Sequence, residues 1–287
     1  AGLPFRTDYY VLFYNKDLFD AAGIEYPSND MTWKEFEETA KKLTSGEGAN
    51  KNYGALLHTW QACVQNWGVQ DGKHTMMDYS TGYDFFKPYY EMALRMQNDD
   101  QSIMDYATMK TANIHYSSPF LTGNVAMMPM GSWFMATLIS KVAVGESKVN
   151  WGVATLPHGD GVPAGSVVGA TTPLCINKAS KNKEAAWEFV KFATSLEGAK
   201  TIAEVGKLPG IINDETLGII TNMAGMPEGV GEALKYNSIV LDRPVASNVS
   251  EVNQMMGEEH SLIMLGEISL EDGLAQMAER SEEIQTN

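Results

Sequence analysis

LPFRTDYYVLFYNKDLFDAAGIEYPSNDMTWKEFEET, which runs from Leu3 to Thr39, is the stretch of sequence that decides the fold. Its residues Tyr9 to Tyr14, YYVLFY, show no alternation of polar and apolar side chains, and this pattern predicts a strand buried on both faces. The polar residues 15–17 end the strand, and Gly23 ends the short apolar helix that follows.

A second helix of the same stretch is predicted to begin after Thr32. Residues 32–35, TWKE, have the form of a capping box, in which the Thr32 hydroxyl accepts from a free amide and Glu35 reaches back. Apolar residues recur behind the box at helical spacing, at Trp33, Phe36, Ala40 and Leu43. Short apolar strands alternate with helices along the rest of the chain, which predicts the α/β class.

Two segments of this region resemble a known family. YYVLFYNKDLFDAAGI (9–24) and TWKEFEETAKKL (32–43) are similar to the start of the second lobe in the sugar-binding proteins of bacterial ABC importers, the maltose-binding-protein-like superfamily. In that family the YNKD strand follows the crossover from the first lobe. The resemblance therefore implies a type II periplasmic-binding-protein fold that is incomplete, with the second lobe and a returning segment of the first lobe. We expect the chain to lack most of its first lobe.

The resemblance continues through later motifs in the family's order, and it implies a division of the chain. SVVGATTPLCI (166–176) resembles the segment that returns to the first lobe, and VGKLPGI (205–211) resembles a turn that precedes further helices. The implied parts are residues 1–165 as the first part of the C-terminal lobe, 166–215 as the returning segment of the N-terminal lobe, 216–245 as the crossover or hinge region, and 246–287 as the closing helices of the C-terminal lobe.

Composition excludes several classes of partner. The formal net charge of −15 over 287 residues argues against nucleic acid or anionic lipid as the main partner, because both require a basic surface. No run of residues reaches the length of a membrane-spanning helix. The two cysteines, Cys63 and Cys175, fall in different lobes on the family interpretation, so we expect two unlinked thiols.

The sequence shows no motif of a known catalytic site. It contains no G-x-S-x-G, H-E-x-x-H or C-x-x-C, and no two of its five histidines are spaced for a metal site. A pair of carboxylates of the glycosidase type stays open, because acidic residues are numerous. We therefore expect a protein that is not an enzyme and that uses no metal or cofactor.

The segment SSPFLTGNVAMMPMGSWFMA (117–136) carries the main candidates for ligand binding. A strand, a turn of small residues and a helix start present free backbone amides, and Trp133 adds a flat apolar face that suits the C–H groups of a sugar. The pattern resembles the family's motif in which a G-x-W tryptophan contacts the sugar. Gly131, Ser132 and Trp133 are therefore candidate site residues, with core packing as the alternative for the tryptophan.

Three further candidates lie elsewhere in the chain. Trp60 lies just past a predicted strand at 53–57, where ligands gather in open α/β sheets, although it could also pack under a loop. Asp8 matches a family position whose carboxylate accepts hydrogen bonds from sugar hydroxyls; the alternatives are a strand-end cap or an ion pair with Arg6. Gly169 lies where a backbone could approach a ligand, or where a strand bulges.

The resemblance implies a function in solute uptake. Two hinged lobes would close on a sugar or oligosaccharide, and a monomer would present it to ABC permease subunits outside the cytoplasm, in the periplasm or lipid-anchored at the outer face of the membrane. Because half of the cleft would be absent, we expect weak or absent sugar binding. A binder of another small solute (a polyamine, a chelate or an anion) stays open, as does a carbohydrate-active enzyme or lectin-like module. The sequence shows no basic cluster that would favour an anion.

Overall fold

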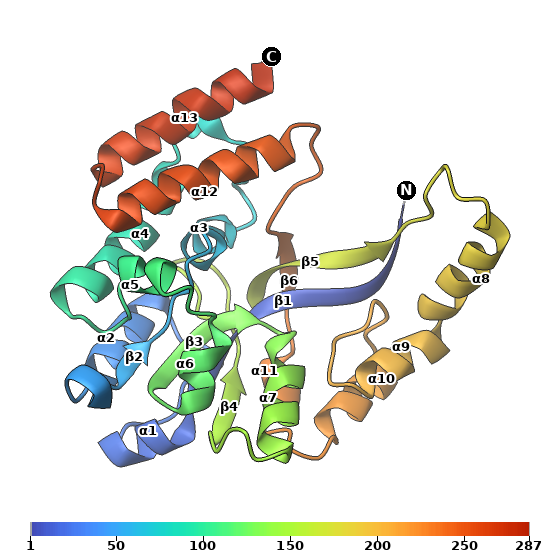
Figure 1. The fold of residues 1–287 in the computed structure, drawn as a ribbon, viewed down its shortest axis with the longest axis horizontal. Helices are drawn as coiled ribbons and strands as arrows, with labels where there is room; N and C mark the ends of the chain where they lie inside the picture. Colours follow the sequence, from blue (N-terminus) through green and yellow to red (C-terminus); the bar gives the residue numbers. More distant parts are fainter. Residues whose placement is uncertain (1, 287) are drawn as a thin grey trace.

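A computed structural model describes residues 2–286, and Figure 1 shows its two unequal parts. The larger part is a sheet flanked by helices, with two long helices from the end of the chain on one side of it. A smaller arm leaves this body along two strands and ends in three helices. We call these parts the body and the arm.

One sheet of six strands forms in the described chain, in the order β2-β3-β1-β5-β6, with β4 also paired to β1. Its strands are β1 (Leu3–Asn15), β2 (Tyr53–Ala55), β3 (Val125–Gly131), β4 (Trp151–Ala154), β5 (Ser166–Leu174) and β6 (Ser238–Leu241). β1 runs antiparallel to β3, β4 and β5, whereas β2 is parallel to β3 and β6 is parallel to β5.

The long strand β1 belongs to both parts of the molecule. Its residues 10–15 pair with β3 on one side and with β4 on the other, inside the body. Its residues 3–9 pair with β5, which runs out into the arm (Figure 1). Residues 9–14 are all buried, so the predicted strand with two buried faces is confirmed.

Helices cover the body on both faces of the sheet (Figure 1). The α-helices of the body are α1 (Lys16–Ala22), α2 (Trp33–Leu43), α3 (Ala62–Val69), α4 (Lys87–Leu94), α5 (Tyr106–Thr111), α6 (Ser117–Thr122), α7 (Phe134–Ala143), α11 (Val230–Ala233), α12 (Val249–Leu265) and α13 (Leu270–Thr286). Short 3-10 turns η1 (Gly48–Asn50), η2 (Tyr79–Thr81) and η3 (Asp84–Phe86) and a π-helical turn η4 (Arg95–Asp99) join some of them.

The predicted helix ends around α1 and α2 are confirmed. The Asn15 side chain accepts from the Asp17 amide at the start of α1, and Gly23 ends α1 in the left-handed conformation. Thr32 and Glu35 form the complete capping box at the start of α2. These local contacts satisfy helix-end amides that would otherwise lack a partner. They define where the two helices that follow the buried half of β1 in the sequence begin and end.

The arm consists of β5, residues 3–9 of β1, and the helices α8 (Lys183–Ala193), α9 (Leu196–Ala203) and α10 (Asp214–Thr221). Val190 and Ala193 of α8 are buried, as expected for a core-facing stripe. The helical spacing of Ala186, Phe189, Val190, Ala193 and Leu196 predicts one buried stripe. This prediction is wrong for two of them, because Phe189 is 61% exposed and Leu196 is also exposed. No element among residues 2–286 covers that side of α8.

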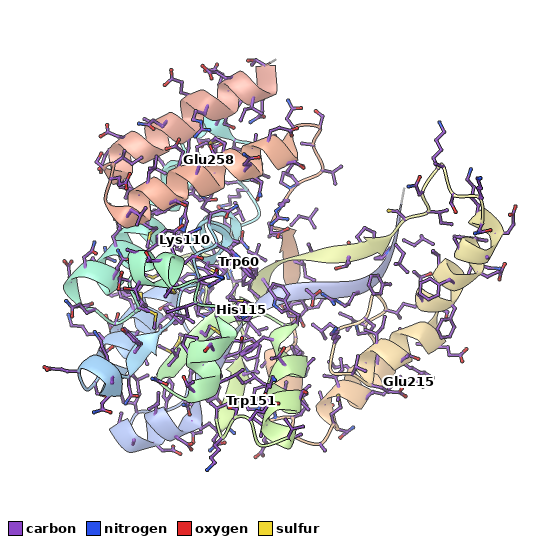
Figure 2. The ribbon with its side chains drawn as sticks, in the orientation of Figure 1. Trp60, Lys110, His115, Trp151, Glu215 and Glu258 are labelled. Carbon is purple, nitrogen blue, oxygen red and sulfur yellow. The ribbon has the colours of Figure 1, made fainter. Side chains whose placement is uncertain are left out.

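Two expectations about single residues can be compared with the structure. Cys63 is buried in α3 and Cys175 is exposed after β5, and both are free thiols in the described part of the chain. The nearly unbroken apolar run of residues 149–156, VNWGVATL, predicts that Trp151 is a core residue. Trp151, labelled in Figure 2, is buried, and its ring centroid lies 6.2 Å from that of Phe13. Within residues 2–286, no helix combines the length and the apolar character needed to cross a bilayer.

Candidate functional site

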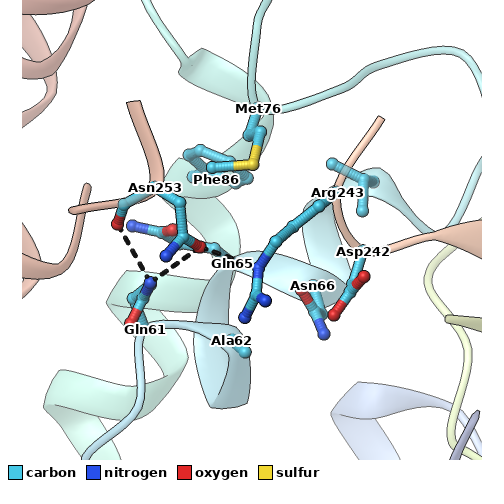
Figure 3. A pocket seen from close by; sticks show the side chains of 10 residues that line it. Gln61, Ala62, Gln65, Asn66, Met76, Phe86, Asp242, Arg243 and Asn253 are labelled. Atoms are coloured by element: carbon cyan, nitrogen blue, oxygen red, sulfur yellow. Dashed lines mark hydrogen bonds between the residues drawn. The ribbon is translucent and has the colours of Figure 1, made fainter. Parts of the chain in front are cut away.

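A groove of about 310 Å³ opens beside Tyr10, at the point where β1 passes from the arm into the body. The residues that line it are Tyr10, Trp60, Gln61, Ala62, Trp133, Asp242, Arg243 and Asn253. A narrower recess of about 20 Å³, shown in Figure 3, continues from it and shares Gln61, Ala62, Asp242, Arg243 and Asn253. Rings therefore form one part of the groove, and amide and charged groups form the other.

The β1–β3 ladder brings the first two rings together. Tyr10 of β1 lies opposite Gly131 at the end of β3, and Trp133 follows two residues later at the start of α7. The Tyr10 and Trp133 rings meet edge to face with centroids 5.8 Å apart. Trp133 is half-buried, so one part of its indole is held by the body and another part faces the groove.

Gly131 is the residue that allows this placement of Trp133. A Cβ atom at position 131 would lie 2.0 to 2.3 Å from three atoms of the Trp133 ring, which is closer than real atoms approach. The indole nitrogen donates a hydrogen bond to the Tyr116 hydroxyl at 3.1 Å, which fixes the ring orientation. Gly131 thus acts through Trp133, and its role in contacting a ligand stays a prediction.

Trp60 supplies the third ring of the groove. It is 39% exposed and lies after β2, just before α3. Its indole meets the His58 ring at 4.7 Å and the Tyr116 ring at 5.6 Å, both edge to face. Burial lowers the pKa of His58 to about 4, with a smaller contribution from His115, so His58 packs against Trp60 as a neutral ring near pH 7.

Asp8 and Ser132 lie behind the groove rather than on its lining. Both are buried, and Ser132 Oγ donates to Asp8 Oδ1 at 3.4 Å. Arg6 donates to Asp8 Oδ2 through Nε at 2.8 Å and through Nη2 at 2.6 Å. The ion pair with Arg6, one of the alternatives for Asp8, is therefore present.

Free backbone amides were expected in the turn after β3, and that of Ser132 is not free. The Ser132 N–H donates to the Tyr9 carbonyl at 2.9 Å, because the turn after β3 stays close to β1. Gly169 of β5 is also buried, and a Cβ atom there would lie 2.3 Å from the Asp8 carbonyl oxygen. Glycine at 169 permits the close approach of β5 to β1; ligand contact at Gly169 stays untested.

The polar part of the groove comes from three distant segments (Figure 3). The Gln61 amide donates to the Asn253 carbonyl and to Asn253 Oδ1, both at 3.2 Å, and Arg243 Nε donates to the same Oδ1 at 3.0 Å. Burial raises the pKa of Asp242, and the neighbouring Arg243 guanidinium partly offsets this rise. The Asn66 amide nitrogen, in the recess, is buried and has no hydrogen-bond partner among residues 2–286.

Sequence reasoning missed Tyr10, Gln61, Asp242 and Arg243 as groove residues. The resemblance implies a further ligand contact in the first turn of the helix predicted at 249–265, at Asn253 and Gln254. Asn253 lines the groove, whereas Gln254 is not part of its lining. Tyr10 had no signal of its own, because residues 9–14 are apolar without alternation. The Asp242–Arg243 pair had no local signal, since only the fold brings it beside Trp60.

A basic cluster adjoins the groove, contrary to the expectation that none exists. A hollow of about 510 Å³ on another side of Trp133 is lined by Arg6, Trp133, Ala136, Thr137, Ser140, Lys141 and Lys207. Its basic side chains come from β1, α7 and the loop after α9, so their grouping depends on tertiary structure. Within residues 2–286, no group of three or more His, Cys, Asp or Glu side chains could hold a metal ion.

Comparisons with known proteins agree with this fold. The family model of the bacterial extracellular solute-binding proteins matches residues 1–200. A sugar transporter protein from Rhizobium etli, solved in an open conformation, is 44% identical with a TM-score of 0.89, over 98% of this chain and 72% of that one. An ABC substrate-binding protein from Listeria monocytogenes in complex with cycloalternan is 22% identical with a TM-score of 0.82, over 99% of this chain and 71% of that one. The second likeness shows the fold alone.

A curated relative binds a different kind of solute. The sn-glycerol-3-phosphate-binding periplasmic protein of Yersinia enterocolitica is 24% identical over 218 residues, which are 72% of this chain and 48% of that protein. The chain spans about half the length of the curated relatives it matches. The expected type II periplasmic-binding-protein fold is confirmed, and the chain belongs to the family of bacterial extracellular solute-binding proteins.

Proposed function

We propose that this protein is the substrate-binding component of an ABC transporter, which captures a sugar or oligosaccharide outside the cytoplasm and delivers it to the membrane permease. The observation that carries the proposal is the groove lined by Trp60, Trp133 and Tyr10 on one part and by amide and charged groups on the other. Such a surface suits a ring that is apolar on its faces and polar at its edge. The similarity to the Rhizobium etli sugar transporter supports it.

The groove favours binding over bond cleavage. Among the described residues that line it, Asp242 is the single carboxyl group, whereas a glycosidase needs a pair of carboxyl groups flanking the scissile bond. Asp8 is buried and paired with Arg6. The Gln61 and Asn253 amides can donate to and accept from sugar hydroxyls, and the two indole faces can hold the ring.

Calorimetric titration of the 287-residue chain with neutral sugars tests the proposal. The panel comprises D-glucose, D-galactose, D-mannose, maltose and mannobiose, and we expect at least one to bind with a Kd in the millimolar range. Trp60→Ala and Trp133→Ala should each weaken that binding about tenfold or more, on the scale of an aromatic anchor. Trp187→Ala is the matched control, because Trp187 is exposed on α8 and lines no part of the groove.

Three outcomes of the titration would contradict or support the proposal. Binding that survives both groove substitutions, or that falls equally with Trp187→Ala, removes the groove from the function. Heat release from none of the sugars at millimolar concentration contradicts sugar capture by this chain. Unchanged melting temperatures of the variants show that the losses are local.

A second candidate is a small phosphate ester. Arg243 in the groove favours a phosphate ester, because a guanidinium can donate hydrogen bonds to two oxygens of one phosphate group. The Yersinia enterocolitica relative, which is named for binding sn-glycerol 3-phosphate, points the same way. Adding sn-glycerol 3-phosphate to the panel decides between the two: tight binding of this compound with no binding of any neutral sugar replaces the first candidate by the second.

A further inference from the structure

The hollow behind Trp133, which we call the basic hollow, is lined by Arg6, Trp133, Ala136, Thr137, Ser140, Lys141 and Lys207. It is distinct from the groove in all of its lining except Trp133, which belongs to both. It holds about 510 Å³, which is enough for a carboxylate or phosphate group and its hydration. Its chemistry therefore bears on what a solute in contact with Trp133 can carry.

One wall of the basic hollow is built by β1 and the segment after α9. The Thr7 amide donates to the Leu208 carbonyl at 3.1 Å, and the Gly210 amide donates to the Phe5 carbonyl at 2.8 Å. These two hydrogen bonds align residues 208–210 with residues 5–7. Arg6 and Lys207, which are far apart in the sequence, are thereby held on the same side of the hollow.

The other wall is one face of α7. Trp133, Ala136, Thr137, Ser140 and Lys141 recur at spacings of three and four residues, which places them on the same side of the helix. Gly206 packs directly on this helix, because a Cβ atom there would lie 3.1 Å from the Ile139 side chain and 3.6 Å from the Ala136 Cα. This packing holds the segment before Lys207 against α7, and Lys207 lines the hollow together with Thr137 and Ser140.

The charge of this wall differs from that of the whole protein. The chain has a net charge of −15, yet three basic side chains and two hydroxyl groups line the hollow and no acidic side chain does among the described residues. Arg6 is paired with Asp8, and Lys141 is paired with Glu146. Lys207 forms no ion pair with any residue of the described chain, so its charge is available to a ligand.

Asp8 has a positioning role in this arrangement. It holds Arg6 through Nε and Nη2 on a single carboxylate oxygen, and it is itself buried. Nη1 of Arg6 has no hydrogen-bond partner in the described part of the protein. The guanidinium is therefore oriented before any ligand arrives, which lowers the entropic cost of binding an anion.

We propose that the basic hollow is an anion subsite and that the transported solute is an acidic sugar, whose ring lies against Trp133 and whose carboxylate or phosphate group lies between Lys207 and Arg6. This inference rests on the proposed function, because it assigns the substrate class of the same site. Trp133 links the two regions, because it lines both the groove and the hollow.

The experiment compares matched neutral and acidic sugars by calorimetry on the 287-residue chain at low ionic strength. The pairs are D-glucose with D-glucuronate and D-galactose with D-galacturonate, and D-glucose 6-phosphate provides the phosphate arm. We expect at least one acidic sugar to bind about tenfold more tightly than its neutral partner, the typical effect of one charge-assisted hydrogen bond. Whether the carboxylate or the phosphate compounds bind more tightly identifies the anionic group.

Lys207→Met should remove that tenfold advantage and leave the affinity for the neutral sugar unchanged. Lys148→Met is the matched control, because Lys148 is exposed beyond α7, does not line the hollow and changes the net charge equally. For the unsubstituted chain, raising the NaCl concentration from 0.02 to 0.5 M should reduce the same advantage, since exposed charges are screened.

Each outcome has one meaning. Equal affinities for neutral and acidic sugars, with binding still dependent on Trp133, overturn the anion subsite and leave the proposed function intact. Absence of binding for every sugar overturns both. Inorganic phosphate that binds as tightly as the acidic sugars and is lost in Lys207→Met overturns the acidic sugar as the solute, because the hollow then takes a free ion.

Discussion

The two halves of β1 have opposite surroundings. Residues 10–15 lie between β3 and β4, and every one of them is buried. Residues 3–6 pair with β5 on one side, and residues 208–210 lie beside Phe5 and Arg6 on the other. Leu3 stays exposed although it is as apolar as the residues of the other half. The same strand thus shows that apolar character creates the tendency to be buried, while the neighbouring elements decide whether burial occurs.

Aromatic side chains repeat the contrast. Phe13, Phe19 and Phe36 of the body are completely buried, whereas Trp187, Phe189 and Phe192 of α8 in the arm are all exposed. Three exposed rings on one helix are unusual on the surface of a protein. No element within residues 2–286 buries them, so phenylalanine can be compared in two environments.

The largest expected effect is the difference between Phe13→Ala and Phe189→Ala. The Phe13 ring packs against Phe134 at 5.2 Å and against Phe120 and Trp151, so its loss leaves a cavity and should lower the free energy of unfolding by about 3–5 kcal/mol. Phe189 is 61% exposed, and its loss should change that free energy by less than about 1 kcal/mol. Urea denaturation followed by far-UV circular dichroism measures both.

Similar losses for the two phenylalanines would contradict the comparison, because they would mean that the face of α8 is covered in solution. A dimer would be one such cover, and sedimentation of the unsubstituted chain shows whether it forms. A rise in solubility of Phe189→Ala with no loss of stability would instead sharpen the contrast between the body and the arm.

Features that depend on local sequence could be predicted before the structure was known. The buried strand, the glycine that ends α1 and the capping box of α2 each involve residues within one or two turns of each other. The sequence also predicts a helix from Val249 to Leu265, and α12 has these bounds. Trp133 was identified because a strand, a small-residue turn and a helix start are adjacent in the sequence.

Features that depend on distant segments could not be predicted. Arg243 lines the groove only because β6 pairs with β5. Lys207 lines the same hollow as Arg6 only because residues 208–210 align with β1. The burial of Phe189 was predicted wrongly, because helical spacing shows which face is apolar but not whether another element covers it. The ion pair of Asp8 was one of three readings that the sequence alone left open.

An intermediate effect is expected from adding one methyl group to two glycines, Gly131 in the body and Gly218 in the arm. Gly131→Ala places a Cβ atom within 2.3 Å of the Trp133 ring, so the ring must move, and the free energy of unfolding should fall by about 1–3 kcal/mol. Tryptophan fluorescence should shift, and affinity for any sugar that binds the groove should fall with it.

Gly218 lies within α10, and a Cβ atom there meets no described atom within 4 Å. Gly218→Ala should therefore stabilise the protein by up to about 1 kcal/mol, because alanine favours a helix interior more than glycine does. A Gly131→Ala protein with unchanged stability and unchanged fluorescence would show that Trp133 is not held against the backbone of β3.

The smallest expected effect compares two helix starts, that of α2 in the body and that of α8 in the arm. The Thr32 hydroxyl accepts from the Glu35 amide at 3.2 Å, and the Glu35 carboxylate accepts from the Thr32 amide at 2.8 Å. Asn182 occupies the same position before α8, but its side chain makes no capping hydrogen bond within the described chain. The two residues are both good capping types, so the difference lies in their surroundings.

Thr32→Ala should lower the free energy of unfolding by about 1 kcal/mol, the usual cost of losing a helix cap. Asn182→Ala should leave it within about 0.5 kcal/mol. The Glu35 carboxyl reports the same bonds, because its hydrogen bonds to Thr32 lower its pKa. In Thr32→Ala that pKa should rise towards its ordinary value, as measured by NMR titration. An unchanged pKa would mean that the hydrogen bond from the residue 32 amide to Glu35 alone maintains the helix start. The difference in stability between the two variants would then have to come from packing.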